Sequence, residues 1–245
     1  MADMPQQASN DAARPNDRIN TDESRRYWEA VSADDNGMLG GFPFVSRADL
    51  RGSRTFLAKL GIGSKPGLRR IGRALEGGAG IGRVTEGLLL DIAEEVDVIE
   101  PVAKFTSALK ERLGVRNVYN VGLEDWTPEV SQDGRDGAGV RYGLVWNQWC
   151  TGYLKDEQLV AYLRRCGSVL EPGVGLLVVK ENLTTTGMDD FDSVDSSVTR
   201  SESSFLDLFA KAGFRLVRSE LQRGFPPEAD LLPVKMYALK PKESA

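Results

Sequence analysis

The 245-residue sequence contains no histidine, and this absence excludes several kinds of active site at once. A Ser-His-Asp triad, a zinc site with histidine ligands, a facial iron triad and a histidine proton shuttle all need an imidazole. Cysteine is scarce as well, because Cys150 and Cys166 are the only two and do not form a C-x-x-C pair. We therefore expect no metal site and no disulfide framework, and a reducing compartment fits.

Long apolar runs and an excess of positive charge are also missing. The longest apolar stretch, at 175–179, is too short to cross a bilayer, and the N-terminal residues lack the apolar core of a signal peptide. With 31 basic and 36 acidic residues, the formal net charge of −5 disfavours a nucleic-acid groove. We expect a soluble monomer of the cytoplasm, with the nucleus as a second location, that binds neither membranes nor nucleic acids.

The composition that is present, 41% hydrophobic and 27% charged residues, is typical of a globular domain. Residues 1–22 have almost no large apolar side chains, which predicts a disordered tail. Residues 23–245 then form a single domain, in which 23–62 is an N-terminal helical segment. A run rich in glycine and aspartate at 129–140 predicts a flexible surface loop.

Apolar patterns typical of strands and of helices alternate along the domain. The predicted strands lie at 71–76, 96–100, 115–121, 142–148 and 173–180, followed by a closing hairpin at 214–221 and 234–239. The predicted helices lie at 49–60, 84–92, 102–113, 156–166 and 203–212. This alternation predicts an α/β fold with a mostly parallel sheet, to which the hairpin adds an antiparallel pair.

A glycine-rich turn, Glu-Gly-Gly-Ala-Gly-Ile-Gly-Arg at 76–83, joins the first strand to the following helix. Glycines allow the backbone to pass close to a bound ligand, although a tight turn without a ligand is the simpler alternative. Glu100 ends the next strand, about 20 residues further on, where a carboxylate can accept hydrogen bonds from ribose hydroxyls. The pattern predicts an adenosine-containing cofactor, and Glu-x-Gly-x-Gly-x-Gly favours S-adenosylmethionine over a dinucleotide.

Two later segments bear on the ligands. Asp125 and Trp126 follow the third strand, where they either flank an adenine or, for Trp126, belong to the core. Residues 147–149, Asn-Gln-Trp, close the fourth strand at the edge where open α/β sheets bind ligands. They lack the prolines of the motif found in nucleic-acid amino methyltransferases, which counts against a nucleobase substrate.

Six segments then occur in an order that resembles one family. They are Tyr27-Trp28, Gly37-Met38-Leu39-Gly40-Gly41, Gly78-Ala79-Gly80-Ile81-Gly82-Arg83, Gln148-Trp149, Lys180-Glu181-Asn182 and Asp195-Ser196-Ser197-Val198-Thr199-Arg200. From about Arg25 to Pro241 the chain resembles the eukaryotic protein α-N-terminal methyltransferases, which methylate the free amine of X-Pro-Lys N-termini. The resemblance implies a class I methyltransferase, with a Rossmann-like seven-stranded mixed sheet, N-terminal helices and a C-terminal hairpin.

The resemblance also implies roles for individual residues. S-adenosylmethionine would be held by Gly78, Gly80, Arg83, Glu100, Leu123 and Gln148. The peptide or protein N-terminus would be bound by Trp28, Leu39, Gly40, Trp149, Asp192 and Ser197. Asp195 would accept the proton of the substrate amine, and Asn182 and Tyr153 would complete the catalytic group. The simpler alternatives are that Trp28 and Trp149 are core aromatics and that Asp195 caps a helix.

The substrate half departs from the family at four places. Tyr153 stands where the family usually has a histidine, and a phenol is a poor base at neutral pH. Asp192 is followed by Ser193, where the family usually has a second acidic residue that reads the substrate lysine. Residues 40–43 are Gly-Gly-Phe-Pro rather than Gly-Gly-Tyr-Gly, and Leu232 replaces a hairpin tyrosine.

Three functions therefore stay open at the level of sequence. The first is α-N-methylation of protein N-termini with a relaxed or altered X-Pro-Lys preference. The second is the same chemistry on a short peptide natural product or an amino-acid-derived metabolite. The third is a module that binds the cofactor without turnover, against which the presence of Asp195 and Asn182 argues.

Overall fold

The computed structural model describes residues 13–128 and 139–242. Residues 1–12 of the predicted tail and 129–138 of the predicted loop lie outside the described residues. The strands are β1 (Ile71–Gly77), β2 (Ala93–Ile99), β3 (Val115–Tyr119), β4 (Leu144–Gln148), β5 (Leu176–Asn182), β6 (Asp190–Asp192), β7 (Ser197–Thr199), β8 (Phe214–Leu221) and β9 (Val234–Pro241). The helices are α1 (Thr21–Ala30), α2 (Asp35–Met38), α3 (Ser46–Ala58), α4 (Leu90–Ile92), α5 (Asp156–Ser168) and α6 (Glu202–Lys211).

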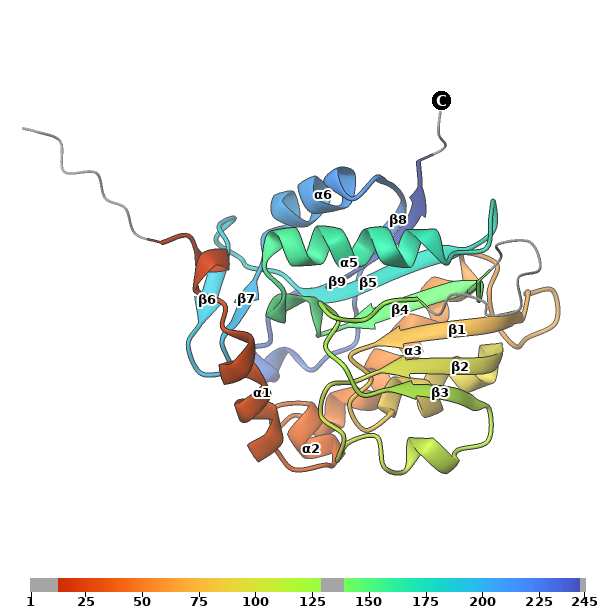
Figure 1. Cartoon of the computed structure of the whole chain (residues 1–245), viewed down its shortest axis with the longest axis horizontal. Helices are drawn as coiled ribbons and strands as arrows, with labels where there is room; N and C mark the ends of the chain where they lie inside the picture. The colour runs from red at the N-terminus through yellow and green to blue at the C-terminus, as the bar shows by residue number, and fades with distance from the viewer. Residues whose placement is uncertain (1–12, 129–138, 243–245) are drawn as a thin grey trace, which may run out of the picture.

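In the described part of the chain, seven strands form one mixed sheet in the order β3-β2-β1-β4-β5-β9-β8. The strands β1 to β5 are parallel, and β9 runs antiparallel to both β5 and β8. Helices α1 and α2 and the small β6–β7 ladder gather at one end of this sheet (Figure 1). The predicted α/β fold with its closing hairpin is confirmed. No helix within 13–128 or 139–242 has the length and apolarity needed to cross a membrane.

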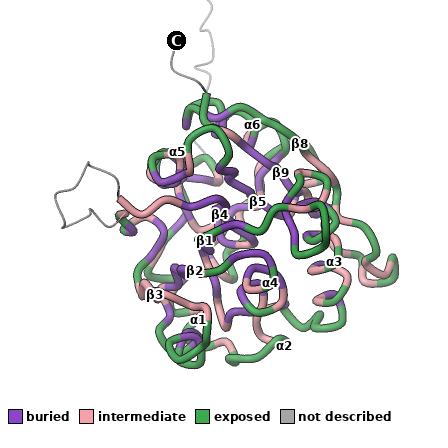
Figure 2. Tube along the Cα trace, turned by 90° about the vertical axis from the view of Figure 1, so that its right-hand side faces the viewer, coloured by how far each residue is buried: buried purple, intermediate pink, exposed green. Residues whose placement is uncertain are grey.

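The core consists of two apolar clusters, one on each face of the sheet. The central strands that separate them are largely buried (Figure 2). Adjacent residues of β4 show the division, because Val145 packs in the layer beneath α5 and α6 while Trp146 packs in the layer beneath α3. Both side chains are fully buried. Successive side chains of a strand point to opposite faces, so a strand covered on both sides is apolar throughout. The sheet is therefore a rigid base from which the strand ends present the site.

The predicted boundary of the disordered tail at residue 22 is wrong. A short 3₁₀ helix spans Pro15–Arg18, and Asn20 caps α1 by accepting hydrogen bonds from the first-turn N–H groups. Ile19 is 3% exposed, and the Asn16 side chain accepts a hydrogen bond from the Asp156 N–H, 2.5 Å away. Polar side chains fix this segment through long-range contacts, which a count of apolar residues does not reveal.

The predicted helix at 102–113 is also wrong. This segment forms successive turns, with only a 3₁₀ turn at Leu109–Glu111. Its first N–H, that of Val102, donates to the Glu100 carboxylate, and the Lys104 ammonium donates to two carbonyls at the end of α1 and just beyond it. These contacts draw the segment around the strand ends, so that tertiary structure overrides the helical apolar spacing.

Candidate active site

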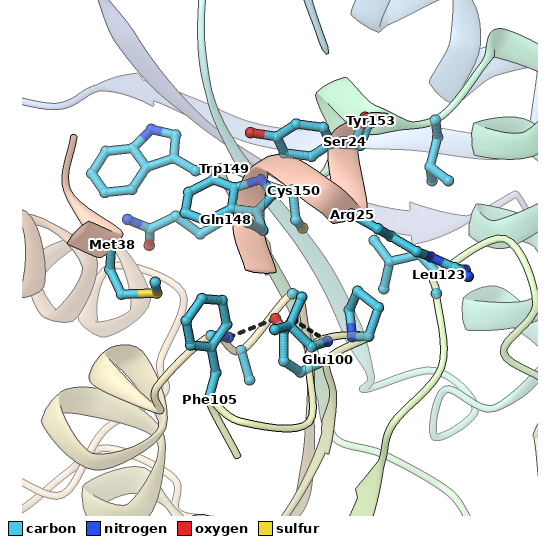
Figure 3. A pocket seen from close by; sticks show the side chains of 18 of the residues that line it. Ser24, Arg25, Met38, Glu100, Phe105, Leu123, Gln148, Trp149, Cys150 and Tyr153 are labelled. Carbon is cyan, nitrogen blue, oxygen red and sulfur yellow. Dashed lines mark hydrogen bonds between the residues drawn. The ribbon is translucent and has the colours of Figure 1, made fainter. Parts of the chain in front are cut away.

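A pocket lies where β1, β2 and β4 end, with α1 along its other side (Figure 3). We call it the cofactor pocket. All six residues predicted to hold the cofactor line it: Gly78, Gly80, Arg83, Glu100, Leu123 and Gln148. Trp126, in contrast, is buried in the core and is not among the lining residues, so the core interpretation holds for it.

The turn after β1 has a backbone that requires glycine. Gly78 and Gly80 have φ values of 67° and 55°, in the left-handed region that side chains disfavour. A Cβ on Gly78 would lie 2.3 Å from the Cβ of Cys150, and one on Gly80 would lie 2.8 Å from the sulfur of Met38. The missing side chains leave the main chain itself as the wall of the pocket.

Glu100, after β2, closes this pocket at the glycine turn. Its two carboxylate oxygens accept hydrogen bonds from the N–H groups of Gly80 and Val102, each at 2.9 Å (dashed in Figure 3). Burial raises the pKa of Glu100, while the same two N–H groups favour its charged form. The carboxylate is thus held in one orientation at the position where ribose hydroxyls would donate to it.

Arg83 and Gln148 line the same pocket, and both are tied to Asp49 of α3. The Arg83 guanidinium lies 2.8 Å from the Asp49 carboxylate, and the Gln148 amide donates to the same carboxylate at 2.9 Å. A guanidinium has five N–H donors, so one contact with Asp49 leaves donors for a ligand carboxylate. A glycine cradle, a fixed carboxylate and a cation together fit the sugar and the amino-acid part of S-adenosylmethionine.

A second pocket, which we call the substrate pocket, adjoins the first. It is lined by the predicted substrate-binding and catalytic residues: Trp28, Leu39, Gly40, Tyr153, Asn182, Asp192, Asp195, Ser197 and Trp149. Trp28, Met38, Trp149 and Tyr153 line both pockets. These four side chains therefore mark the junction across which a group would pass from one ligand to the other.

Asp195 stands in the substrate pocket with both carboxylate oxygens hydrogen-bonded. One accepts from the Tyr153 hydroxyl at 2.8 Å, and the other accepts from the Ser197 N–H at 3.1 Å. Strand β7 follows instead of a helix, so the alternative of a helix cap is wrong. Burial and the neighbouring Asp195 charge raise the pKa of Tyr153 well above its ordinary value, which makes the phenol a donor and not a base.

The residue after Asp195 is held by the N-terminal helix. Ser196 has a φ of 57°, unusual for a residue with a side chain, and is 2% exposed. Its hydroxyl accepts from the Asn20 N–H at 2.9 Å, and its carbonyl accepts from the Ser24 hydroxyl at 3.2 Å. The start of α1 thus fixes the backbone that presents Asp195.

Trp149 and Asn182 form one wall of the substrate pocket. Trp149 has a φ of 53°, and its indole N–H donates to the Asn182 side-chain oxygen at 3.1 Å. Indole can only donate, so the contact assigns the oxygen to this partner and leaves the Asn182 NH₂ to donate elsewhere. The alternative that Trp28 and Trp149 are merely core aromatics is wrong, because both border the pockets.

Comparisons with known proteins identify the family. The family described as AdoMet-dependent proline di-methyltransferases matches residues 16–240. The chain belongs to this family. It is therefore an S-adenosylmethionine-dependent methyltransferase, and the interpretation as a binding module without turnover is set aside.

Individual relatives agree over most of this methyltransferase. Alpha N-terminal protein methyltransferase 1 of Schizosaccharomyces pombe is 46% identical over 227 residues, which are 89% of this chain and 94% of that protein. N-terminal Xaa-Pro-Lys N-methyltransferase 1 of Danio rerio is 39% identical over 84% of this chain and 89% of its own. A solved S-adenosylmethionine-dependent methyltransferase of Leishmania major is 33% identical, with a TM-score of 0.77 over 90% of this chain and 82% of that one.

Several residues of the methyltransferase site escaped the sequence prediction. Asp49 and Glu181 are buried carboxylates, and Glu181 accepts from the N–H groups of Cys150 and Thr151, at 2.9 and 2.8 Å, so that it fixes the turn after β4. Met38 borders both pockets. Met38 and Glu181 lie inside quoted segments, which could have found them, whereas nothing in the sequence near Asp49 marks it.

The arginine of the Asp-Ser-Ser-Val-x-Arg segment serves the fold of the methyltransferase. Arg200 is fully buried and donates to the carbonyls of Thr151 and Leu154, at 3.0 and 2.6 Å. It also pairs with Asp156 at 2.9 Å. A buried guanidinium with all these acceptors locks the β4 turn, which carries Tyr153, against the strand that follows Asp195.

Proposed function

We propose that this enzyme transfers methyl groups to the free α-amine of protein N-termini that begin with X-Pro-Lys. The observation that carries the proposal is the junction of the two pockets, where Asp195 and Tyr153 stand beside the shared wall. The names of the relatives from Schizosaccharomyces pombe and Danio rerio, which specify N-terminal and Xaa-Pro-Lys methylation, support the same acceptor.

The chemistry asks two things of the protein. An α-amine has a pKa of about 7.7–8.0, so at neutral pH it must lose a proton before its lone pair can attack. In this proposal Asp195 accepts that proton, and the Tyr153 hydroxyl, which donates to its carboxylate, orients it. S-adenosylmethionine supplies the electrophilic methyl group. The walls of Trp28 and Trp149 restrict the orientation of the amine, and the Asn182 NH₂ donates to a substrate carbonyl.

Recognition of the substrate lysine falls to Asp192 in this proposal. Asp192 lines the substrate pocket and is exposed, and its side chain accepts from the Val194 N–H at 2.7 Å. With Ser193 beside it in place of a second acid, one carboxylate reads the lysine. The enzyme should therefore prefer lysine at the third position less strongly than a site with two acids would.

A second candidate, methylation of a short peptide natural product or an amino-acid-derived metabolite, is favoured by one observation. Phe42 and Leu232 line the substrate pocket and are 36% and 42% exposed, which gives it an apolar rim. Such a rim suits a compact apolar substrate as well as an extended polypeptide. Location in the cytoplasm and nucleus and a monomeric state also stay predictions.

Mass spectrometry can test the proposal directly. The purified enzyme is incubated with S-adenosylmethionine and three matched peptides: Ser-Pro-Lys followed by a fixed tail, its N-acetylated copy, and Ser-Pro-Gln with the same tail. Methylation of the two free peptides, faster for lysine, and none of the acetylated copy is expected. Methylation of the acetylated copy would overturn α-amine transfer. Failure on all three, in enzyme that binds the cofactor, would favour the metabolite.

A further inference from the structure

A buried polar cluster lies behind the cofactor pocket, centred on Asp49 of α3. The Asp49 side chain is fully buried, yet its carboxylate contacts three other side chains. One oxygen lies 2.5 Å from the Lys180 ammonium, the other lies 2.8 Å from the Arg83 guanidinium, and the Gln148 NH₂ donates to both, at 2.9 and 3.0 Å. One acid therefore joins the two cofactor-pocket donors to a buried lysine.

Lys180, in β5, connects the cluster to the sheet. Its ammonium is also fully buried and donates to the Ser53 hydroxyl at 2.9 Å and to the Gln222 side-chain oxygen at 2.8 Å. Gln222 in turn donates to the Ala48 carbonyl, one residue before Asp49. These contacts pin the position of Asp49 on α3 relative to the sheet, so the carboxylate cannot follow a ligand.

The charges of the cluster do not cancel. Burial lowers the pKa of Lys180 to about 8 and raises the pKa of the nearby Glu76 to about 8, so at pH 7 Lys180 is mostly charged and Glu76 is mostly neutral. Lys180 and Arg83 then oppose the single negative charge of Asp49. Opposing its burial, the two cations hold the pKa of Asp49 below its ordinary value. One positive charge remains, and Arg83 is the cation of the cluster that lines the pocket. A buried excess charge is stabilised by an anion at its open side.

We propose that Asp49 is a positioning residue for cofactor binding. Its carboxylate orients the Arg83 guanidinium and the Gln148 amide toward the carboxylate of the amino-acid part of S-adenosylmethionine, and Lys180 holds Asp49 in place. The proposal rests on the assignment of Arg83 to that carboxylate. It does not depend on which amine accepts the methyl group.

Calorimetric binding of two ligands tests the proposal without any methyl acceptor. S-adenosylhomocysteine has the amino-acid part, whereas 5′-methylthioadenosine lacks it. For Asp49→Asn we expect the Kd of S-adenosylhomocysteine to rise about tenfold or more, the equivalent of about 1.4 kcal/mol, and that of methylthioadenosine to stay within about twofold. The matched control is Asp91→Asn, an exposed acid paired with Arg54, which should change neither Kd.

Two results would overturn the proposal. An equal rise in both Kd values would make Asp49 a support of the whole fold, and an unchanged Kd for S-adenosylhomocysteine would mean that Arg83 is held without it. If Asp49→Asn does not fold, Asp49→Glu retains the charge and displaces it by one methylene, and the same split between ligands is expected. When Asp49→Asn is combined with Arg83→Gln, the rise in the Kd of S-adenosylhomocysteine should be smaller than the product of the two single rises, because Asp49 acts in part through Arg83.

Discussion

The cofactor pocket and the substrate pocket share a wall but are built in different ways. The cofactor pocket is formed by the ends of adjacent parallel strands, and its charged groups are buried and paired, as Arg83 is with Asp49. The substrate pocket is assembled from α1, the segment before α3, the turn after β4, the β6–β7 ladder and the loop before β9. Its rim includes the exposed side chains of Phe42, Asp192 and Leu232.

This difference separates what the two pockets tolerate. At the glycine turn the main chain itself forms the wall of the cofactor pocket. A substitution there adds a side chain to this wall and weakens cofactor binding. A rim of exposed side chains on loops can change its chemistry while the fold stays the same. All four departures from the family pattern, among them Tyr153 and Ser193, accordingly fall in the substrate half.

The largest effect is expected for Asp195→Asn, which should affect only the substrate side. Loss of a proton acceptor lowers kcat by about a hundredfold or more. The Kd of S-adenosylmethionine, measured by calorimetry, should change by less than about twofold. Asp207→Asn, an exposed acid paired with Lys211 on α6, is the matched control and should leave both unchanged. A loss of cofactor affinity as large as the loss of kcat would show that Asp195 acts on cofactor binding and not on the substrate.

The mirror experiment is Gly80→Ala, which should affect only the cofactor side. The φ of 55° costs a side chain about 1–2 kcal/mol, and the new Cβ would press on Met38. We expect the Kd of S-adenosylmethionine to rise about tenfold, with kcat at saturation nearly unchanged. Gly72→Ala, in the preceding strand β1, has open space around its Cβ and should bind S-adenosylmethionine normally. An unchanged affinity of Gly80→Ala for S-adenosylmethionine would contradict the assignment of the glycine turn to cofactor binding.

Tyr153→Phe probes the shared wall, and its effect is smaller. Loss of one hydrogen bond to Asp195, about 1 kcal/mol, should lower kcat about fivefold. Because the pKa of Tyr153 is raised well above its ordinary value, the hydroxyl stays protonated through pH 10. We expect kcat/KM of both forms to rise with pH and level off above about 8, where the substrate amine is neutral. A fall between pH 8.5 and 10 confined to the wild type would mean that Tyr153 titrates.

The smallest effect concerns the rim. An exposed ion pair contributes about 0.2–1 kcal/mol, so Asp192→Asn should raise the KM for a Ser-Pro-Lys peptide about threefold and leave a Ser-Pro-Gln peptide unaffected. Ser193→Asp should lower the KM for the lysine peptide by a similar factor. Steady-state kinetics on both peptides check this pair of variants. Equal changes for lysine and glutamine would show that Asp192 does not read the third residue.

The cofactor half was predictable because its signals are local in sequence. A strand, a glycine turn and an acid one strand later fix Gly78, Gly80 and Glu100 within one structural unit, and strand alternation predicts the sheet. The residues of the substrate pocket were predicted only from the resemblance to a family, because neither periodicity nor spacing links Trp28 to Asp195. The structure brings them together through contacts that span most of the chain.

The features that the sequence did not predict share one physical cause. Asp49, the segment 13–22 and the turns at 102–113 are determined by long-range polar contacts, such as the Asp49–Lys180 pair. A local window contains only one partner of each such contact. Propensity and apolar spacing then favour a helix or a disordered tail until the distant partner is supplied.

The hydrogen bonds between Ser196 and the start of α1 have a consequence for the order in which the site forms during synthesis. The hydrogen bonds of Asn20 and Ser24 to Ser196 join residues 176 and 172 positions apart in sequence. During synthesis the glycine turn emerges long before Ser196 does, and α1 has no partner for these bonds until Ser196 has been made. Asp195, the proposed proton acceptor, therefore reaches its place only after Ser196 has been made, so a nascent chain can form the glycine turn before it can form the substrate pocket.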